Sequence, residues 1–279
     1  MPLVTLKQML NDALSNNYAI CAFNVENLEM AQAVILSADN LYSPVIIQTT
    51  PSTLKYAPPE VFVGMIKSLA DLVRIPVALH LDHGSNLEIL KHCLTAGYTS
   101  VMIDGSLLPF EENIALSKKA VIMSGIIPVE AELGTIGGKE DSLSAGIQYA
   151  NPNQVNDFVR QTSVFSLAVA IGTAHGVYKG NPKLDLNLLK KIHELVDIPL
   201  VLHGTSGVPE DLVRACIRLG ISKVNYATDL RIAYTDAIRN WVSKNMNSFD
   251  PKQIGNDAKE AVVKIVSDRI RLVGSDGKA

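Results

Sequence analysis

The sequence lacks the features that place a chain in a membrane or on nucleic acid. It contains no apolar stretch of the roughly 20 residues needed to span a bilayer. Its net charge is −3, and it has neither a basic run nor aromatic residues interleaved with basic ones. We therefore expect neither a membrane nor a nucleic acid as a partner.

Cysteine is scarce as well. Cys21, Cys93 and Cys216 are odd in number, scattered, and without the spacing of metal ligands. The segment Met1–Asn16 has the pattern of an amphipathic helix and not the basic and apolar regions of a secretory signal. These features predict a soluble protein of the reducing cytoplasm, whose thiols serve only packing.

Eight apolar, β-branched runs recur along the 279 residues and alternate with helical stretches such as Glu60–Val73 and Leu186–Val196. The runs are Tyr18–Val25, Pro44–Thr50, Ile75–His83, Tyr98–Ser106, Ile126–Gly134, Ser166–Thr173, Ile198–Gly204 and Ile221–Thr228. Near-continuous apolar strands between helices indicate a parallel sheet buried on both faces. Eight such units are typical of an α/β barrel of the (β/α)8, or TIM, type. An open doubly wound sheet is the alternative, which the missing G-x-G-x-x-G after the first run disfavours.

The chain is long and apolar enough for one large core, with 47% hydrophobic residues and no linker, internal repeat or low-complexity tract. We predict a single barrel domain over residues 1–279 with extra terminal helices, the last over Pro251–Leu272. The longest interval between strands holds Thr135–Tyr149, which is polar and contains glycine. Long segments of this kind are usually lids or binding loops.

Four of the six histidines stand at the C-terminal ends of apolar runs. His80 and His83 end the third run, His175 follows the sixth, and His203 ends the seventh. These ends meet at one mouth of a parallel barrel, so the imidazoles are expected to share a pocket. Imidazole is the commonest zinc ligand, and a catalytic zinc needs about three protein ligands and one open position. The distribution therefore indicates a metal enzyme.

The other strand ends are polar too. They carry Asn24, Thr50, Asp82, Asp104, Glu130, Glu132, Asn225 and Thr228. A barrel with a purely structural role has no reason to carry such a set of polar groups. A single Asp at a strand end, however, is about as likely to cap the next helix as to catalyse a reaction. The seventh run continues into Gly204–Gly207, and the eighth ends immediately before a helix. Barrels often bind phosphate at these two loops, so we expect a phosphate site there.

Taken together, these segments resemble the class II, metal-dependent ketose-bisphosphate aldolases, and most closely the tagatose-bisphosphate aldolase branch. The resemblance covers nearly the whole chain. It is carried by Tyr18–Asn24, His80–His83, Ser100–Ser106, Val129–Gly134, Gly137–Asp141, Gly172–Gly176, Leu202–Gly207 and Lys223–Asn225.

The resemblance implies a zinc ion bound by His83, His175 and His203, with Asp104 and Glu132 able to hold a second or displaced metal position. It also allows a monovalent cation. His80 is not a ligand in this pattern, and we interpret it as a residue that orients a neighbour.

The same resemblance makes Asp82 the acid and base for the C4 hydroxyl, and Glu140 the mobile-loop carboxylate that exchanges the C1 proton. Strand alternation would point Asp82 and His83 to opposite faces unless the strand bends there, which Gly84 favours. The implied substrate-binding residues are Asn24, Thr50, Gly176, Gly204, Thr205, Ser206, Asn225, Tyr226, Ala227 and Thr228. For the distal phosphate the candidates are Arg231, Arg269 and Arg271.

The implied activity is reversible cleavage of a ketose 1,6-bisphosphate, tagatose or fructose, to dihydroxyacetone phosphate and glyceraldehyde 3-phosphate through a zinc-stabilised enediolate. The same chemistry on another ketose 1-phosphate, such as 6-deoxy-6-sulfofructose 1-phosphate, is the alternative, because Thr205 and Tyr226 depart from the usual pattern. A non-catalytic sugar-phosphate-binding barrel and a Schiff-base enzyme using Lys223 are further alternatives. Relatives are homodimers or homotetramers, and we expect the same here.

Overall fold

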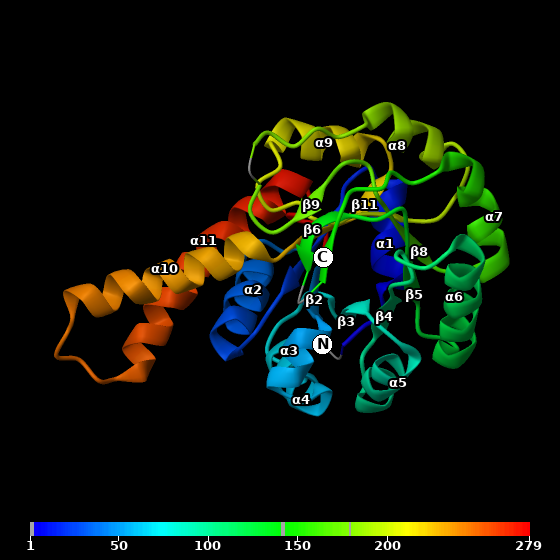
Figure 1. Ribbon diagram of the computed structural model, residues 1–279. Helices are drawn as coiled ribbons and strands as arrows, with labels where there is room; N and C mark the ends of the chain where they lie inside the picture. Colours follow the sequence, from blue (N-terminus) through cyan, green and yellow to red (C-terminus); the bar gives the residue numbers. More distant parts are fainter. Residues whose placement is uncertain (1–2, 141–142, 179) are drawn as a thin grey trace.

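The computed structural model describes residues 3–140, 143–178 and 180–279, and of residues 139, 140 and 143–145 it describes the backbone alone. Eight parallel strands close into a barrel in the order β1-β11-β10-β8-β5-β4-β3-β2 (Figure 1). The barrel strands are β1 (Ile20–Asn24), β2 (Val45–Thr49), β3 (Val77–Gly84), β4 (Ser100–Ile103), β5 (Val129–Leu133), β8 (Ser166–Val169), β10 (Leu200–Leu202) and β11 (Ile221–Tyr226). The predicted (β/α)8 barrel is confirmed, and each strand lies within its predicted run or extends it by one residue.

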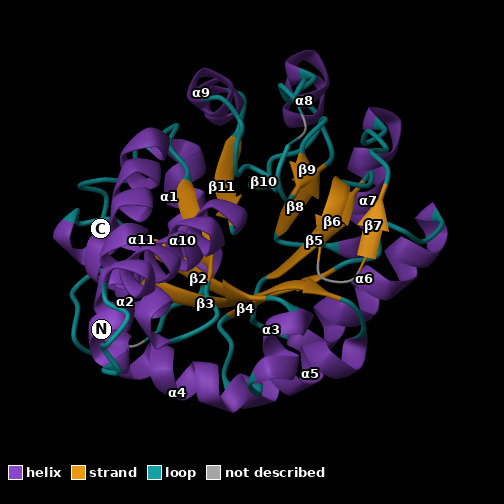
Figure 2. Cartoon of the chain, turned by 60° about the vertical axis from the view of Figure 1, so that its left-hand side comes forward, coloured by secondary structure: helices purple, strands orange, loops and turns teal. Residues whose placement is uncertain are grey.

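Helices surround the barrel on its outer side (Figure 2). They are α1 (Leu6–Ser15), α2 (Leu28–Asn40), α3 (Pro51–Tyr56), α4 (Pro59–Ala70), α5 (Leu87–Ala96), α6 (Phe110–Ser124), α7 (Pro152–Thr162), α8 (Leu186–His193), α9 (Glu210–Arg218), α10 (Thr228–Lys244) and α11 (Pro251–Val273). In Figure 1 the paired α10 and α11 extend away from the barrel. Among the helices of the described ranges, none is long and apolar enough to cross a membrane.

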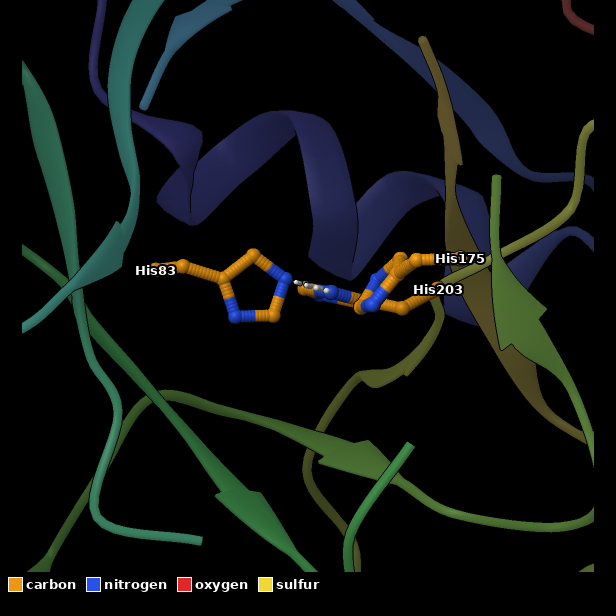
Figure 3. A group of neighbouring side chains, drawn as sticks. All are labelled: His83, His175 and His203. Carbon is orange, nitrogen blue, oxygen red and sulfur yellow. Dashed lines mark hydrogen bonds between the residues drawn. The ribbon is translucent and has the colours of Figure 1, made fainter. Parts of the chain in front are cut away.

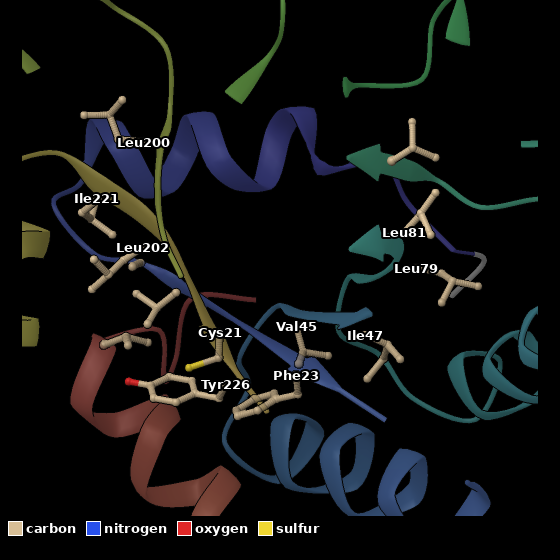
Figure 4. Packing of buried hydrophobic residues seen from close by; sticks show 14 of the residues in the cluster. Cys21, Phe23, Val45, Ile47, Leu79, Leu81, Leu200, Leu202, Ile221 and Tyr226 are labelled. Atoms are coloured by element: carbon tan, nitrogen blue, oxygen red, sulfur yellow. The ribbon is translucent and has the colours of Figure 1, made fainter. Parts of the chain in front are cut away.

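Residues alternate between two environments along each barrel strand. In β1, Cys21 and Phe23 belong to the large cluster between the sheet and the helices (Figure 4). Ile20 and Ala22 belong to a separate cluster inside the barrel. This period of two follows from the pleat of a strand, and it explains why strands that are buried on both faces are apolar almost throughout.

Helix α1 lies against the N-terminal end of the barrel, where Leu6, Leu10 and Ala13 share a hydrophobic cluster with Ile46 and Ala78. The amphipathic pattern predicted for the first 16 residues is confirmed by α1. Its apolar face covers the interior of the barrel at this end. The polar side chains at the strand ends lie at the opposite, C-terminal mouth.

A small second sheet lies at that mouth. It contains β6 (Gly137–Glu140), β7 (Leu143–Ala145) and β9 (Ala174–His175), in the order β7-β6-β9. The segment predicted as an irregular loop is thus partly a hairpin, with β6 and β7 antiparallel. Because β6 pairs in parallel with β9, the hairpin is attached to the segment that carries His175.

Candidate active site

Three histidines from different strands converge at the mouth. His83 lies in β3, His175 in β9, and His203 follows β10 directly. Each offers one ring nitrogen within 4.8 Å of the others. His83 Nε2 and His203 Nδ1 face each other at 2.9 Å, with the His175 ring beside them (Figure 3). Three of the four imidazoles at the strand ends therefore come together, and His80 is not in this group.

The backbone at His83 explains how two consecutive residues of β3 both reach the mouth. His83 has φ +49°, and the pairing of β3 with β4 shifts between Leu81 and Gly84. This irregularity breaks the alternation of the strand. The predicted bend is present, but the left-handed conformation falls on His83 itself and not on Gly84.

Burial and neighbouring charges set the protonation of the imidazoles. Burial, together with the positive charge of His83, holds the pKa of His175 and of His203 well below the usual range. Burial alone would lower the pKa of His83 too, but the carboxylates of Asp82 and Asp104 outweigh burial and raise this pKa well above its usual value. The neutral imidazole is the form in which histidine binds a divalent metal.

A second donor group shares His83. Its Nδ1 lies 2.8 Å from Asp104 Oδ2 and 4.0 Å from Glu132 Oε2. Glu132 Oε2 is buried and has no hydrogen-bond partner among the described residues. Burial and the charge of Asp104 raise the pKa of Glu132 well above its usual value. An orphaned carboxylate oxygen beside an imidazole fits a cation, so the donor sets accord with the predicted zinc and with a second position.

Asp82 is fixed by three amides. Its Oδ2 accepts from Asn24 Nδ2 at 2.9 Å and from Gln48 Nε2 at 3.2 Å, and its Oδ1 accepts from Asn225 Nδ2 at 3.2 Å. Burial alone would raise the pKa of Asp82, but the positive charges of His83 and Lys223, with the hydrogen bond from Asn24, outweigh burial and lower it. The carboxylate is therefore ionised at neutral pH. Gln48 had no role in the sequence analysis, although its inward position in β2, two residues before Thr50, is a signal for one.

A buried charged network adjoins His83, His175 and His203, which we call the metal-ligand group because they could hold a metal ion. Glu130 Oε1 is 2.8 Å from His203 Nε2, and Lys223 Nζ donates to Glu130 Oε2 at 2.9 Å. His80 Nδ1 lies 2.7 Å from Ser100 Oγ. A carboxylate on the far nitrogen of a ligand histidine fixes its tautomer and orientation. The sequence analysis noted Glu130 as polar but assigned it no role; here it orients His203.

A pocket opens beside Asp82 and His175. It is lined by Asn24, Asp82, Ala174, His175, Gly176, Gly204, Thr205, Ser206, Asn225, Ala227 and Thr228. Gly204 has φ +62°, and a Cβ there would lie 2.7 Å from the Ala174 carbonyl oxygen, so this close approach of two loops needs glycine. The loops predicted to bind phosphate therefore border the same pocket as the metal-ligand group.

Some predicted residues lie elsewhere. Thr50 is the N-cap of α3, with its Oγ1 3.5 Å from the Thr53 amide nitrogen. Tyr226 is buried in the core, stacked on Phe23 at a ring distance of 5.9 Å, and is not among the pocket-lining residues. The Glu140 backbone ends β6, and its side chain lies outside the described part of the structure.

The three candidate arginines also separate. Arg231 pairs with Glu26, whose other carboxylate oxygen accepts from Thr53 Oγ1 at 2.8 Å, near Thr50. Arg269 pairs with Asp229. Arg271 is exposed and lies 3.9 Å from Asp268, its neighbour on α11. Of the three, Arg231 is the one connected to the loop that carries Thr50.

Imidazoles and carboxylates at the C-terminal mouth of a (β/α)8 barrel define a metal-dependent barrel enzyme. The sequence profile described as "Fructose-bisphosphate aldolase class-II" matches residues 4–278. The chain belongs to this family and is a class II aldolase, an aldehyde-lyase of a kind that typically depends on zinc.

Individual relatives agree with this assignment. The chain is 42% identical, over its full length and 99% of the relative, to a protein named fructose-bisphosphate aldolase from Geobacillus stearothermophilus. It is 39% identical to the YdjI aldolase of Escherichia coli K12, whose crystal structure superposes with a TM-score of 0.89 over 99% of both chains. A putative fructose-1,6-bisphosphate aldolase from Coccidioides immitis is 29% identical, with a TM-score of 0.90 over 97% of this chain and 96% of that one.

Proposed function

We propose that this protein reversibly cleaves a ketose 1,6-bisphosphate, of the fructose or tagatose type, to dihydroxyacetone phosphate and glyceraldehyde 3-phosphate. The observation that carries the proposal is the convergence of three imidazoles beside Asp82, a buried carboxylate held by three amides. A pocket lined by glycines and hydroxyls adjoins them. The names of the Geobacillus and Coccidioides relatives support a fructose bisphosphate.

His83, His175 and His203 would hold a zinc ion, which supplies the Lewis acid for the negative charge that develops when the C3–C4 bond breaks. Asp82 removes the C4 hydroxyl proton during cleavage and returns it during condensation. This role requires an ionised carboxylate in a fixed position, and the amides of Asn24, Gln48 and Asn225 provide that position.

The pocket takes the dihydroxyacetone phosphate half of the substrate. Its phosphate meets the loops of Gly176 and Gly204–Ser206 and the start of α10 at Thr228, where backbone N–H groups favour an anion. Glu140, on the β6–β7 hairpin, exchanges the C1 proton. Asn24 and Thr50 contact the remainder of the substrate, and Arg231 binds the distal phosphate after leaving Glu26.

The rest of the proposal concerns the whole protein. Residues 1–279 act as one catalytic domain in the cytoplasm, and two or four copies assemble. The site binds zinc with room for a monovalent cation. Size-exclusion chromatography with light scattering tests the assembly, and a monomer at micromolar concentration would contradict it.

A cleavage assay across three substrates tests the function. Fructose 1,6-bisphosphate, tagatose 1,6-bisphosphate and 6-deoxy-6-sulfofructose 1-phosphate are compared at equal enzyme concentration, with and without a chelator, through a coupled assay for dihydroxyacetone phosphate. We expect cleavage of a bisphosphate that the chelator abolishes and zinc restores. The ratio of kcat/KM between the two bisphosphates assigns the sugar. Cleavage that survives complete metal removal, or preference for the sulfonated sugar, would contradict the proposal.

A trapping experiment tests the Schiff-base alternative. Lys223 Nζ is buried and bonded to Glu130 at 2.9 Å, so it has no open side for a ketone. Borohydride reduction in the presence of substrate should leave the mass of the protein unchanged. A covalent adduct on Lys223 would overturn the metal mechanism.

A further inference from the structure

A carboxylate stands directly behind the pocket proposed for the substrate phosphate. Ser206, which lines the pocket, donates its hydroxyl to Asp229 Oδ1 at 2.5 Å. The backbone nitrogen of Asp229 in turn lies 3.4 Å from Ser206 Oγ. Asp229 lies in the first turn of α10 and is largely buried. An anion at this position would repel a phosphate unless its charge is cancelled.

Arg269 supplies the cancelling charge from a distant part of the chain. Its Nε and Nη2 both lie 3.1 Å from Asp229 Oδ2. The side chains of Arg269 and Asp229 are 21% and 16% exposed, so the pair is only weakly screened by water. The second oxygen of Asp229 remains free to accept from Ser206.

The aromatic ring of Tyr226 fixes the arginine. The Arg269 guanidinium carbon lies 5.3 Å from the centre of this ring, within range of a cation–π contact. Tyr226 itself is buried and stacked on Phe23 (Figure 4). Helix α11 therefore places the Arg269 guanidinium behind the end of the pocket proposed for the phosphate of the dihydroxyacetone half. From the sequence, Arg269 was a candidate for binding the distal phosphate instead.

We propose that Asp229 and Arg269 form a positioning pair for the phosphate of the dihydroxyacetone half. Asp229 orients the Ser206 hydroxyl and its loop, and Arg269 cancels the carboxylate charge so that a phosphate dianion can bind in front of it. The inference rests on the proposed function in that it takes phosphate as the ligand of this pocket. Neither residue of the pair touches the reacting carbon atoms.

A cycle of variants tests the pair through binding. Calorimetric titrations with inorganic phosphate and with dihydroxyacetone phosphate are compared for the wild type, Arg269→Met, Asp229→Asn and the double variant. Arg269→Met leaves the Asp229 charge unpaired, so we expect phosphate affinity to fall by about 10-fold or more. Asp229→Asn removes the charge, while the amide oxygen can still accept from the Ser206 hydroxyl, so it should bind phosphate at least as tightly as the wild type. The double variant should recover most of the affinity lost in Arg269→Met.

Two further variants separate charge from folding. Arg269→Lys retains the cation and should bind phosphate within a few-fold of the wild type. Arg271→Met removes an exposed arginine from the same helix and is the matched control, with no expected change. In active enzyme, Arg269→Met should raise KM much more than it lowers kcat, because the pair acts on phosphate binding.

Each outcome decides the inference. Unchanged phosphate affinity in Arg269→Met, a double variant no better than Arg269→Met, or no binding of either ligand to the wild type would overturn it. Phosphate binding can be measured without turnover. If the variants show the expected phosphate affinities but the wild type cleaves no ketose bisphosphate, the proposed function alone is overturned. Cleavage without the pattern would overturn the positioning pair alone. If Arg269→Met does not fold, weaker phosphate binding by Asp229→Asn is sufficient to overturn it.

Discussion

At the scale of single residues, Asp82 is the group whose chemistry is tested most directly. Asp82→Asn keeps the shape of the side chain but removes the carboxylate that we propose takes the C4 hydroxyl proton. We expect kcat for cleavage to fall by about 10²–10⁴-fold, because general base catalysis contributes on that order. The measurement is steady-state cleavage of the bisphosphate together with the zinc content of the variant.

A partial reaction supplies the control for Asp82→Asn. Exchange of the proton on dihydroxyacetone phosphate with solvent involves no C4 hydroxyl, so this exchange should persist in the variant. Zinc content should also remain, because Asp82 is in neither group of residues that could hold a metal ion. Loss of both zinc and exchange would instead show that Asp82 maintains the structure of the site.

The thiols carry a prediction that is independent of the active site. Cys21, Cys93 and Cys216 are buried, and burial raises the pKa of Cys93 and of Cys216 to about 12 and that of Cys21 well above its usual value. The thiolate is the reactive form. At pH 8 the native protein should therefore show no fast reaction with a thiol-specific disulfide reagent, and all three thiols should react after unfolding. A single thiol reacting within seconds in the native state would contradict this.

The polar strand ends could be predicted from the sequence, but their partners could not. Alternation along β5 places Glu130 and Glu132 on one face, and both do point inward. Glu130 contacts His203 and Glu132 lies near His83, however, and these pairings depend on distances across the barrel. The left-handed backbone of His83 could not be predicted either, because only about a few per cent of non-glycine residues adopt it, even though histidine is among the more frequent of these.

At the scale of elements, the β6–β7 hairpin depends on close packing against β9. Gly138 in β6 has φ +89°, and a Cβ there would lie 2.2 Å from the His175 carbonyl oxygen. Gly138→Ala should displace His175, and a displacement of about 1 Å can cost about 10²-fold in kcat. Zinc affinity, measured by competition with a chelator, should fall as well.

Gly146→Ala is the matched control for that variant. A Cβ on Gly146 would meet nothing within 4 Å, although the residue lies a few positions away in the same segment. Its kcat and zinc affinity should match the wild type. Equal losses in both variants would mean that the whole segment, and not the contact with His175, matters.

The β6–β7 hairpin could not be predicted from the sequence. Residues 135–149 have no periodicity, and β6 begins with Gly137 and Gly138, so the local pattern resembles a loop. Pairing of Gly137 and Gly138 with Ala174 and His175 creates the strand, and it joins segments far apart in the chain. The barrel strands lie in apolar runs whose burial on both faces leaves a local signature, and these were predicted correctly.

At the scale of the whole molecule, the two ends of the barrel differ: the N-terminal end is filled by apolar side chains, and the C-terminal mouth carries the polar groups of the candidate active site. The N-terminal end is apolar and covered by α1, with Leu10 fully buried against Ile20 and Ile46. The C-terminal mouth holds buried carboxylates, imidazoles and a left-handed histidine, which are costly to bury and constrain the fold. The apolar end, together with the large cluster between the sheet and the helices, offsets this cost.

Leu10→Ala tests this division. Loss of a fully buried leucine should lower the free energy of unfolding by about 2–5 kcal/mol, measured by urea denaturation followed by circular dichroism. Leu72→Ala, at a leucine that is 79% exposed, is the control and should change stability by no more than about 0.5 kcal/mol. Leu10 lies at the end of the barrel opposite the metal-ligand group. We therefore expect kcat to remain within about twofold of the wild type as long as the variant is folded. A marked fall in kcat alongside normal zinc content would show that the packing of α1 is transmitted through the barrel to Asp82, and that the two ends are not independent.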